Sequence, residues 1–77
     1  MNIFKLKEYD QNHLLYLYQP EGRGKWGEIL YDFVNGVAQI VTRADESSSW
    51  HDRHALSKVE ECAKAKSLPL SFTQAWY

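Results

Sequence analysis

Patterns of hydrophobic and polar residues predict two strands in the first twenty residues of this chain. In residues 3–9, Phe4 and Leu6 fall on one side of an extended backbone, and Lys5 and Lys7 fall on the other. Residues 14–18 read Leu-Leu-Tyr-Leu-Tyr, a short apolar and aromatic run that is typical of a strand with both faces largely covered. Polar residues 10–12 separate the two strands, and residues 19–22 end the second one.

The dipeptide Asn35-Gly36 predicts a β-hairpin. Both residues tolerate the positive φ angles of a two-residue type I′ turn, and β-prone residues flank them on each side. In the register of that turn the cross-strand pairs are Val34 with Val37, Phe33 with Ala38, Tyr31 with Ile40, Ile29 with Thr42, and Glu28 with Arg43.

The two faces of this hairpin differ in composition. One face carries the candidate core residues Ile29, Tyr31, Phe33, Ala38 and Ile40. The other face carries the polar residues Glu28, Asp32, Gln39 and Arg43 together with Leu30, Val34, Val37 and Val41.

Residues 50–66 have the 3.6-residue periodicity of a helix. We expect Ser49 and Asp52 to form a short capping box at its start, and Pro69 prevents its continuation. A stripe of roughly 120° forms its buried face and contains Ala55, Leu56, Val59, Cys62 and Ala63. Residues 70–77 indicate a short strand or an extended tail, with one side formed by Leu70, Phe72 and Trp76.

These elements, in this order, predict an α+β fold. We expect an antiparallel four-stranded meander sheet, one C-terminal helix packed on one face, and a short extended tail or fifth strand. The 77 residues make one small domain, residues 1–77, and the 44% hydrophobic content argues against disorder. A chain of this length buries only about 60% of its unfolded surface, so we expect marginal stability unless the many aromatic residues or a partner subunit contribute.

Charge and cysteine content limit the classes of partner. Nine Lys and Arg against ten Asp and Glu give a net charge of -1, too weak a field to attract polyanions or acidic membranes. Cys62 has no second cysteine with which to form an internal disulfide, which favours a cytoplasmic location. The longest apolar run, residues 14–18, is too short to cross a membrane, so we expect no membrane partner.

Residues 22–27, Gly-Arg-Gly-Lys-Trp-Gly, match the spacing G-x-G-x-x-G. In a dinucleotide site a helix follows these glycines, whereas here residues 28–31 continue as a strand, so we reject that interpretation. An alternative hypothesis is that Arg23, Lys25 and Trp26 bind an anion or single-stranded nucleic acid. The scattered basic residues of the chain favour instead a solvated connection, with Trp26 folded back onto the sheet.

The remaining reactive side chains predict no enzyme, metal site or cofactor. His51 and His54 are close on the helix, but Cys62 is eight residues beyond His54, about 12 Å along the axis, so the three cannot share an ion. Cys62 lies on the apolar stripe without a neighbouring base. Helix capping alone explains the serines at positions 47–49.

Two interpretations of Trp50 are open. It falls almost opposite the apolar stripe, and His54 shares its outward direction. We expect Trp50 to precede the regular helix and to curl under the sheet. The alternative is an exposed patch of Trp50 and His54, of the kind enriched at interaction hot spots.

Our leading functional hypothesis is a small cytoplasmic protein-interaction module. One helix covers one face of a sheet, so the apolar residues of the second face need another cover, either the tail or another protein. We therefore expect binding to another protein or to a second copy, through that face or an edge strand. The expected interaction residues are Leu30, Val34, Val37, Val41, Trp50, His54 and Trp76.

Overall fold

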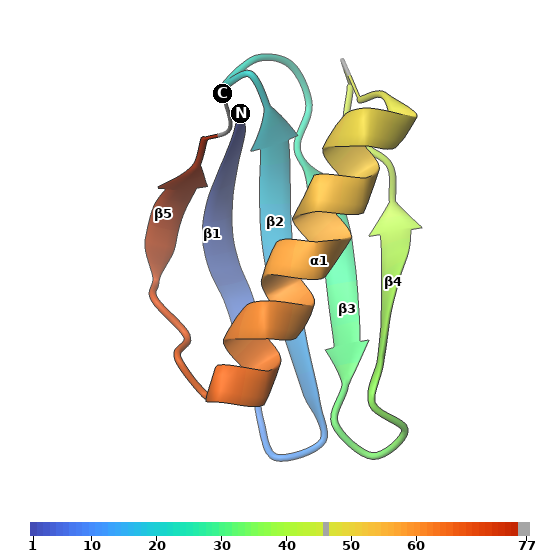
Figure 1. The fold of residues 1–77 in the computed structure, drawn as a ribbon, viewed down its shortest axis with the longest axis vertical. Coiled ribbons are helices and arrows are strands. Elements are labelled where there is room, and N and C mark those ends of the chain that lie inside the picture. The colour runs from blue at the N-terminus through green and yellow to red at the C-terminus, as the bar shows by residue number, and fades with distance from the viewer. Residues whose placement is uncertain (46, 76–77) are drawn as a thin grey trace.

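The structure, a computed structural model, describes residues 1–45 and 47–75 as one layer of sheet and one layer of helix (Figure 1). The helix is α1 (Ser49–Ala65), and the strands are β1 (Asn2–Tyr9), β2 (His13–Pro20), β3 (Gly27–Asp32), β4 (Val37–Thr42) and β5 (Ser71–Gln74). The sheet is antiparallel with the order β4-β3-β2-β1-β5. The predicted α+β fold is confirmed, and the tail supplies a fifth strand.

Helix α1 runs diagonally across one face of the sheet (Figure 1). Its fully buried residues are Ala55, Val59, Cys62 and Ala63, so the predicted apolar stripe is confirmed. The predicted capping box is wrong, because the N-cap is Ser48, whose Oγ accepts the N–H of His51 at 3.3 Å. Asp52 instead accepts hydrogen bonds from the Tyr18 hydroxyl at 2.9 Å and from Arg43 Nε at 3.0 Å.

The core lies between α1 and the sheet, and large side chains from the sheet fill it. Phe4, Tyr16 and Tyr18 are fully buried. Phe72 of β5 stacks on Phe4 with ring centroids 4.7 Å apart, and its ring lies edge-on to Tyr16. The helix contributes mainly small residues at this interface, which allows the bulky rings of the sheet to pack closely beneath it.

The β3–β4 hairpin is present, but its predicted register is wrong by two residues. Asp32 pairs with Val37 and Tyr31 with Ala38, so the loop has four residues, 33–36, instead of two. Within this loop only Gly36 has a positive φ angle, whereas a type I′ turn needs two such residues. The expected pairing of Glu28 with Arg43 is also absent, since Glu28 pairs with Thr42.

The side chain of Asp32 explains the longer loop. Its carboxylate accepts the N–H groups of Val34 and Asn35, and it also accepts Asn35 Nδ2 at 2.7 Å. The Gly36 N–H closes the turn on the Asp32 carbonyl at 2.8 Å. A shift of two residues leaves the side chains from Ile29 to Ile40 on their predicted faces, because side chains alternate with a period of two. A bulge at Val41 then reverses Thr42 and Arg43, so Thr42 bonds to Glu28 and Arg43 bonds to Asp52 of α1.

The tail extends the sheet and does not fold beneath it. β5 pairs with β1, with Phe72 opposite Phe4, and Phe72 points into the helix-covered core. The described part of the tail therefore leaves the second face of the sheet open. The expected cover by Trp76 concerns a residue outside the described ranges.

Candidate functional site: the helix-free face of the sheet

The face of the sheet opposite α1, called here the helix-free face, carries a group of aliphatic side chains. Leu15, Leu17 and Leu30 are half-buried on it, and Leu15 lies directly opposite Leu30 on the neighbouring strand. Towards β4 the exposure increases, with Val37 at 53% and Val41 at 55%. Val34, in the hairpin loop, is 74% exposed. Four of the predicted interaction residues thus lie at or beside one margin of this face.

Charged residues on the helix-free face are paired with neighbours in the same chain. Lys7 Nζ donates to Glu28 Oε2 at 3.1 Å, and Thr42 Oγ1 donates to Glu28 Oε1 at 2.7 Å. The bond from Thr42 and then the contact with Lys7 hold the pKa of Glu28 below its usual value. Lys5 Nζ lies 5.1 Å from the centre of the Trp26 ring, in a cation–π contact. Because these charged groups already have partners in the chain, burial of the aliphatic side chains is the main source of favourable free energy for binding another protein at this face.

Near the β3–β4 hairpin the helix-free face contains a shallow hollow. Its volume is about 340 Å³, and it is lined by Leu30, Asp32, Asn35, Val37 and Gln39. The hydrogen bonds that Asp32 accepts fix one wall of the hollow and lower the pKa of that carboxyl, with the side chain of Asn35 as the largest cause. The hollow therefore combines a fixed polar wall with exposed aliphatic groups.

The alternative anion site at the β2–β3 loop has two exposed cations and a carboxylate at its base. Arg23 and Lys25 are exposed, but Asp45 lies beside Lys25, with its carboxylate 3.2 Å from the Lys25 N–H. Trp26 is half-buried at the helix-free face, where Lys5 lies over its ring. The expected folding of Trp26 onto the sheet agrees with this position.

Trp50 lies on the outer side of α1, so its expected position under the sheet is wrong. The side chain is 53% exposed, and its ring centroid is 4.7 Å from that of His54. The helix begins at Ser49, one residue earlier than predicted, which fixes Trp50 in the first turn and turns it outward. This aromatic patch of Trp50 and His54 is separated from the helix-free face by the whole sheet (Figure 1).

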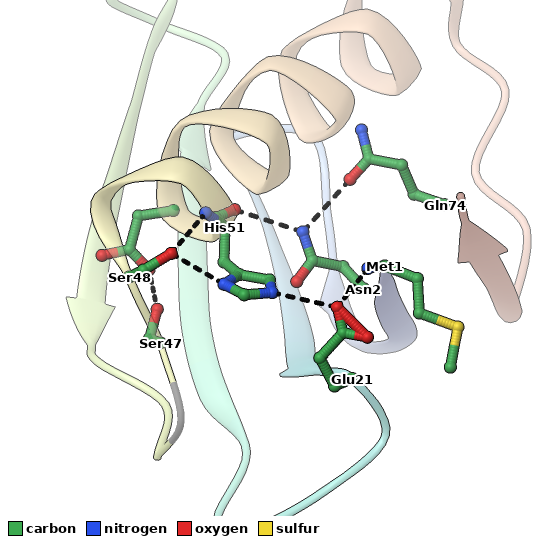
Figure 2. Close-up of polar contacts among 8 residues, drawn as sticks. Met1, Asn2, Glu21, Ser47, Ser48, His51 and Gln74 are labelled. Carbon is green, nitrogen blue, oxygen red and sulfur yellow. Dashed lines mark hydrogen bonds and ion pairs between the residues drawn. The ribbon is translucent and has the colours of Figure 1, made fainter. Parts of the chain in front are cut away.

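A polar cluster at the start of α1 was not predicted from the sequence. Figure 2 shows His51 between Ser48 and Glu21: Ser48 Oγ is 2.8 Å from His51 Nδ1, and His51 Nε2 is 3.2 Å from Glu21 Oε1. Asn2, which is fully buried, donates from Nδ2 to the carbonyl of His51 at 3.1 Å and to Gln74 Oε1 at 3.2 Å. Glu21 is thirty residues from His51, and only the folded chain brings them together.

The order serine, histidine, carboxylate is one that nucleophilic enzymes use. Here the Ser48 hydroxyl also accepts one of the free N–H groups in the first turn of α1, that of His51, which is the ordinary role of an N-cap serine. The bonds of Asn2 and Gln74 likewise end on carbonyls of the first helical turns, those of His51 and His54. The arrangement therefore holds the helix start against β1 and β5.

Metal and thiol chemistry find no support in the described structure. Among residues 1–45 and 47–75, no group of three or more His, Cys, Asp or Glu side chains is placed to hold a metal ion. Cys62 is buried, and burial raises the pKa of its thiol, which disfavours the reactive thiolate.

No family model, no curated protein and no solved structure matches this chain. Within residues 1–45 and 47–75, α1 is too short and too polar to cross a membrane. The class defined by the geometry is an α+β domain in which one helix covers one face of a five-stranded antiparallel sheet.

Proposed function

We propose that this chain is a protein-interaction module that self-associates through the helix-free face of its sheet. One observation carries the proposal: α1 covers one face, β5 extends the edge of the sheet, and Val37 and Val41 on the second face stay more than half exposed. Burial of such side chains against another protein removes apolar surface from water, which favours association.

The charges on this face are compatible with a second copy as the partner. Lys5 and Lys7 nearly balance Glu8, Glu28 and Asp32, so the formal charges on the face sum to -1. Two copies therefore repel each other only weakly, whereas a strongly charged partner would gain little electrostatic attraction. We also propose a reducing, cytoplasmic setting, which the unpaired Cys62 thiol supports.

Sedimentation velocity over a concentration series from about 10 µM to about 1 mM tests the proposal. We expect a concentration-dependent dimer, and we expect Val37→Lys to weaken its association constant at least tenfold, about 1.4 kcal/mol. Leu70→Lys is the matched control, because Leu70 is 78% exposed and lies in the segment between α1 and β5. A wild-type chain that stays monomeric throughout contradicts the proposal.

Two further variants separate this surface from its competitors. If Trp50→Ala abolishes the dimer and Val37→Lys does not, the patch on α1 is the interface. If Trp26→Ala abolishes a salt-sensitive affinity for an oligonucleotide, the alternative nucleic-acid function holds instead.

A further inference from the structure

We infer that the second copy binds along the outer edge of β4, with the two β4 strands antiparallel and Gln39 opposite Gln39 of the second copy. The inference rests on the proposed function, because it takes a second copy as the partner. It narrows the contact to the β4 margin of the helix-free face, where Val37 and Val41 would meet the same residues of the second copy while the rest of the face stays open. It also adds the register in which the copy binds.

β4 is an edge strand without the usual protection. The sheet order places β3 on one side of β4 and, among residues 1–45 and 47–75, no strand on its second side. Natural edge strands usually carry a lysine, a proline or another charge that blocks pairing with a second sheet. The six residues of β4 read Val-Ala-Gln-Ile-Val-Thr and contain none of these. The edge therefore offers unpaired backbone groups and β-prone side chains together.

Pairing of β4 with itself gives a closed assembly. A contact between β4 of one copy and β5 of the next would repeat without end and would build a filament. β5 is also shorter, with four residues against six. Two β4 strands related by a twofold axis use the same edge on both copies and complete a dimer with one ten-stranded sheet.

The faces of β4 define the register. Directly opposed residues in an antiparallel pair share a face, so an exposed residue of β4 must lie opposite another exposed residue. Registers centred on Gln39 and on Ile40 each pair five residues of β4. Centring on Ile40 would set Ala38 of the helix-covered face against Thr42, whose partner Glu28 lies on the helix-free face, so the rule excludes it. Centring on Gln39 sets Val37 against Val41 and Ala38 against Ile40 of the second copy. On the helix-free face, four valines would surround two adjacent Gln39 amides, which can hydrogen-bond to each other.

A bulge at the end of β4 is compatible with this register. Ile40 pairs with Ile29 and Thr42 with Glu28, so Val41 is the extra residue and the strand bends there. Residues 38–40 then supply the regular backbone pairing, and Val41 adds a side-chain contact to Val37 of the second copy.

A charge exchange at the twofold axis tests the register. Gln39→Lys places two ammonium groups opposite each other, and Gln39→Glu places two carboxylates there. We expect each variant alone to associate at least tenfold more weakly than the wild type, and an equimolar mixture of the two to regain dimerisation. The same exchange at Thr73, an exposed residue of β5, is the matched control. Thr73→Lys, Thr73→Glu and their equimolar mixture should all associate as strongly as the wild type. If the charge variants at positions 39 and 73 have the same effect on the association constant, the inference is wrong.

Cross-linking gives a second, independent measurement. In a Cys62→Ala background, Gln39→Cys would place two cysteines across the axis, with the Cα spacing of about 4.5–5.5 Å that a disulfide accepts. We expect it to oxidise to a covalent dimer at least tenfold faster than Thr73→Cys. If the wild type dimerises but position 39 does not cross-link faster than position 73, the inference is wrong and the proposed function stands. If the wild type is monomeric, both are wrong.

Discussion

Gly27 offers a sharp test of the packing at the start of β3. A Cβ atom at this position would lie 2.6 Å from the backbone nitrogen of Ala44 and 2.7 Å from the carbonyl oxygen of Thr42, and it would also overlap Cε1 of Tyr18. Two of these obstacles are backbone atoms, and Tyr18 is fully buried, so none can move aside without disturbing the sheet.

The magnitude for Gly27→Ala follows from two opposed effects. Alanine restricts the unfolded chain and alone would stabilise the fold by about 0.4–1 kcal/mol. Overpacking of a close-packed site costs about 1–3 kcal/mol and sometimes more. We expect a net loss near 2 kcal/mol, which lowers the melting temperature of a domain of this size by about 8–16 °C.

Thermal and urea unfolding followed by far-UV circular dichroism measure this loss, and an unchanged urea m-value would show that the unfolded state is the same. Gly36→Ala is the control, because its φ angle is +69° but its nearest atom beyond the turn, Tyr31 Oη, is 3.8 Å from the built Cβ. That variant suffers backbone strain of about 1–2 kcal/mol without a clash. The packing argument fails if Gly27→Ala is as stable as the wild type.

Three further predictions concern single side chains. Tyr18→Phe removes the acceptor of the buried Ala44 N–H and one of the donors to the Asp52 carboxylate, so we expect a loss of about 1–3 kcal/mol in urea unfolding. Tyr9→Phe is the near-neutral control, because Tyr9 is more than half exposed. Asp32→Ala should lower the melting temperature most above about pH 4. Because the folded-state pKa of Asp32 is lowered, its carboxylate stabilises the fold fully above the unfolded-state pKa and loses this effect as the pH falls through the folded-state pKa. The difference in melting temperature between wild type and variant should therefore narrow towards about pH 2. The buried Cys62 thiol should react slowly with Ellman's reagent in the native protein and rapidly in urea, and equal rates would show that it is accessible.

The strands β2 and β3 and the helix could be predicted from the sequence because each has one face that is more buried than the other along its whole length. In β2 the side chains alternate between buried and half-buried positions from His13 to Pro20, and in α1 the small residues recur at helical spacing. Such periodicity depends only on neighbours in the chain, so a single sequence carries it.

The hairpin register depended on one side chain that the turn dipeptide does not reveal. Asn35-Gly36 is compatible with a two-residue turn, but the three hydrogen bonds to the Asp32 carboxylate stabilise a four-residue loop. With a two-residue turn, Asp32 would be an exposed residue within the strand. With the four-residue loop, its carboxylate accepts backbone N–H groups of the loop. The energy difference between the two turns is local, but it depends on geometry that a residue pattern does not specify.

Contacts between residues far apart in the sequence could not be predicted from residue spacing. Asn2, Glu21 and His51 come from β1, the loop after β2 and the first turn of α1, and no periodicity links them. The outward position of Trp50 depends in the same way on where the helix begins, which Ser48 decides by capping it one residue earlier than expected.

The two faces of the sheet use different kinds of side chain, and this difference supports the proposed interface. On the helix-covered face, tyrosine hydroxyls fix α1 at both ends: Tyr18 donates to Asp52 in the first turns, and Tyr16 donates to the carbonyl of Pro69 just beyond the last turn. Burial raises the pKa of Tyr16 to about 12, so this donor keeps its proton throughout the physiological range. The helix-free face has aliphatic groups near β4 in place of such directional donors, and aliphatic contacts gain free energy with any well-fitting apolar surface. Orientation must then come from the backbone, and the unprotected edge of β4 is where this sheet can supply it.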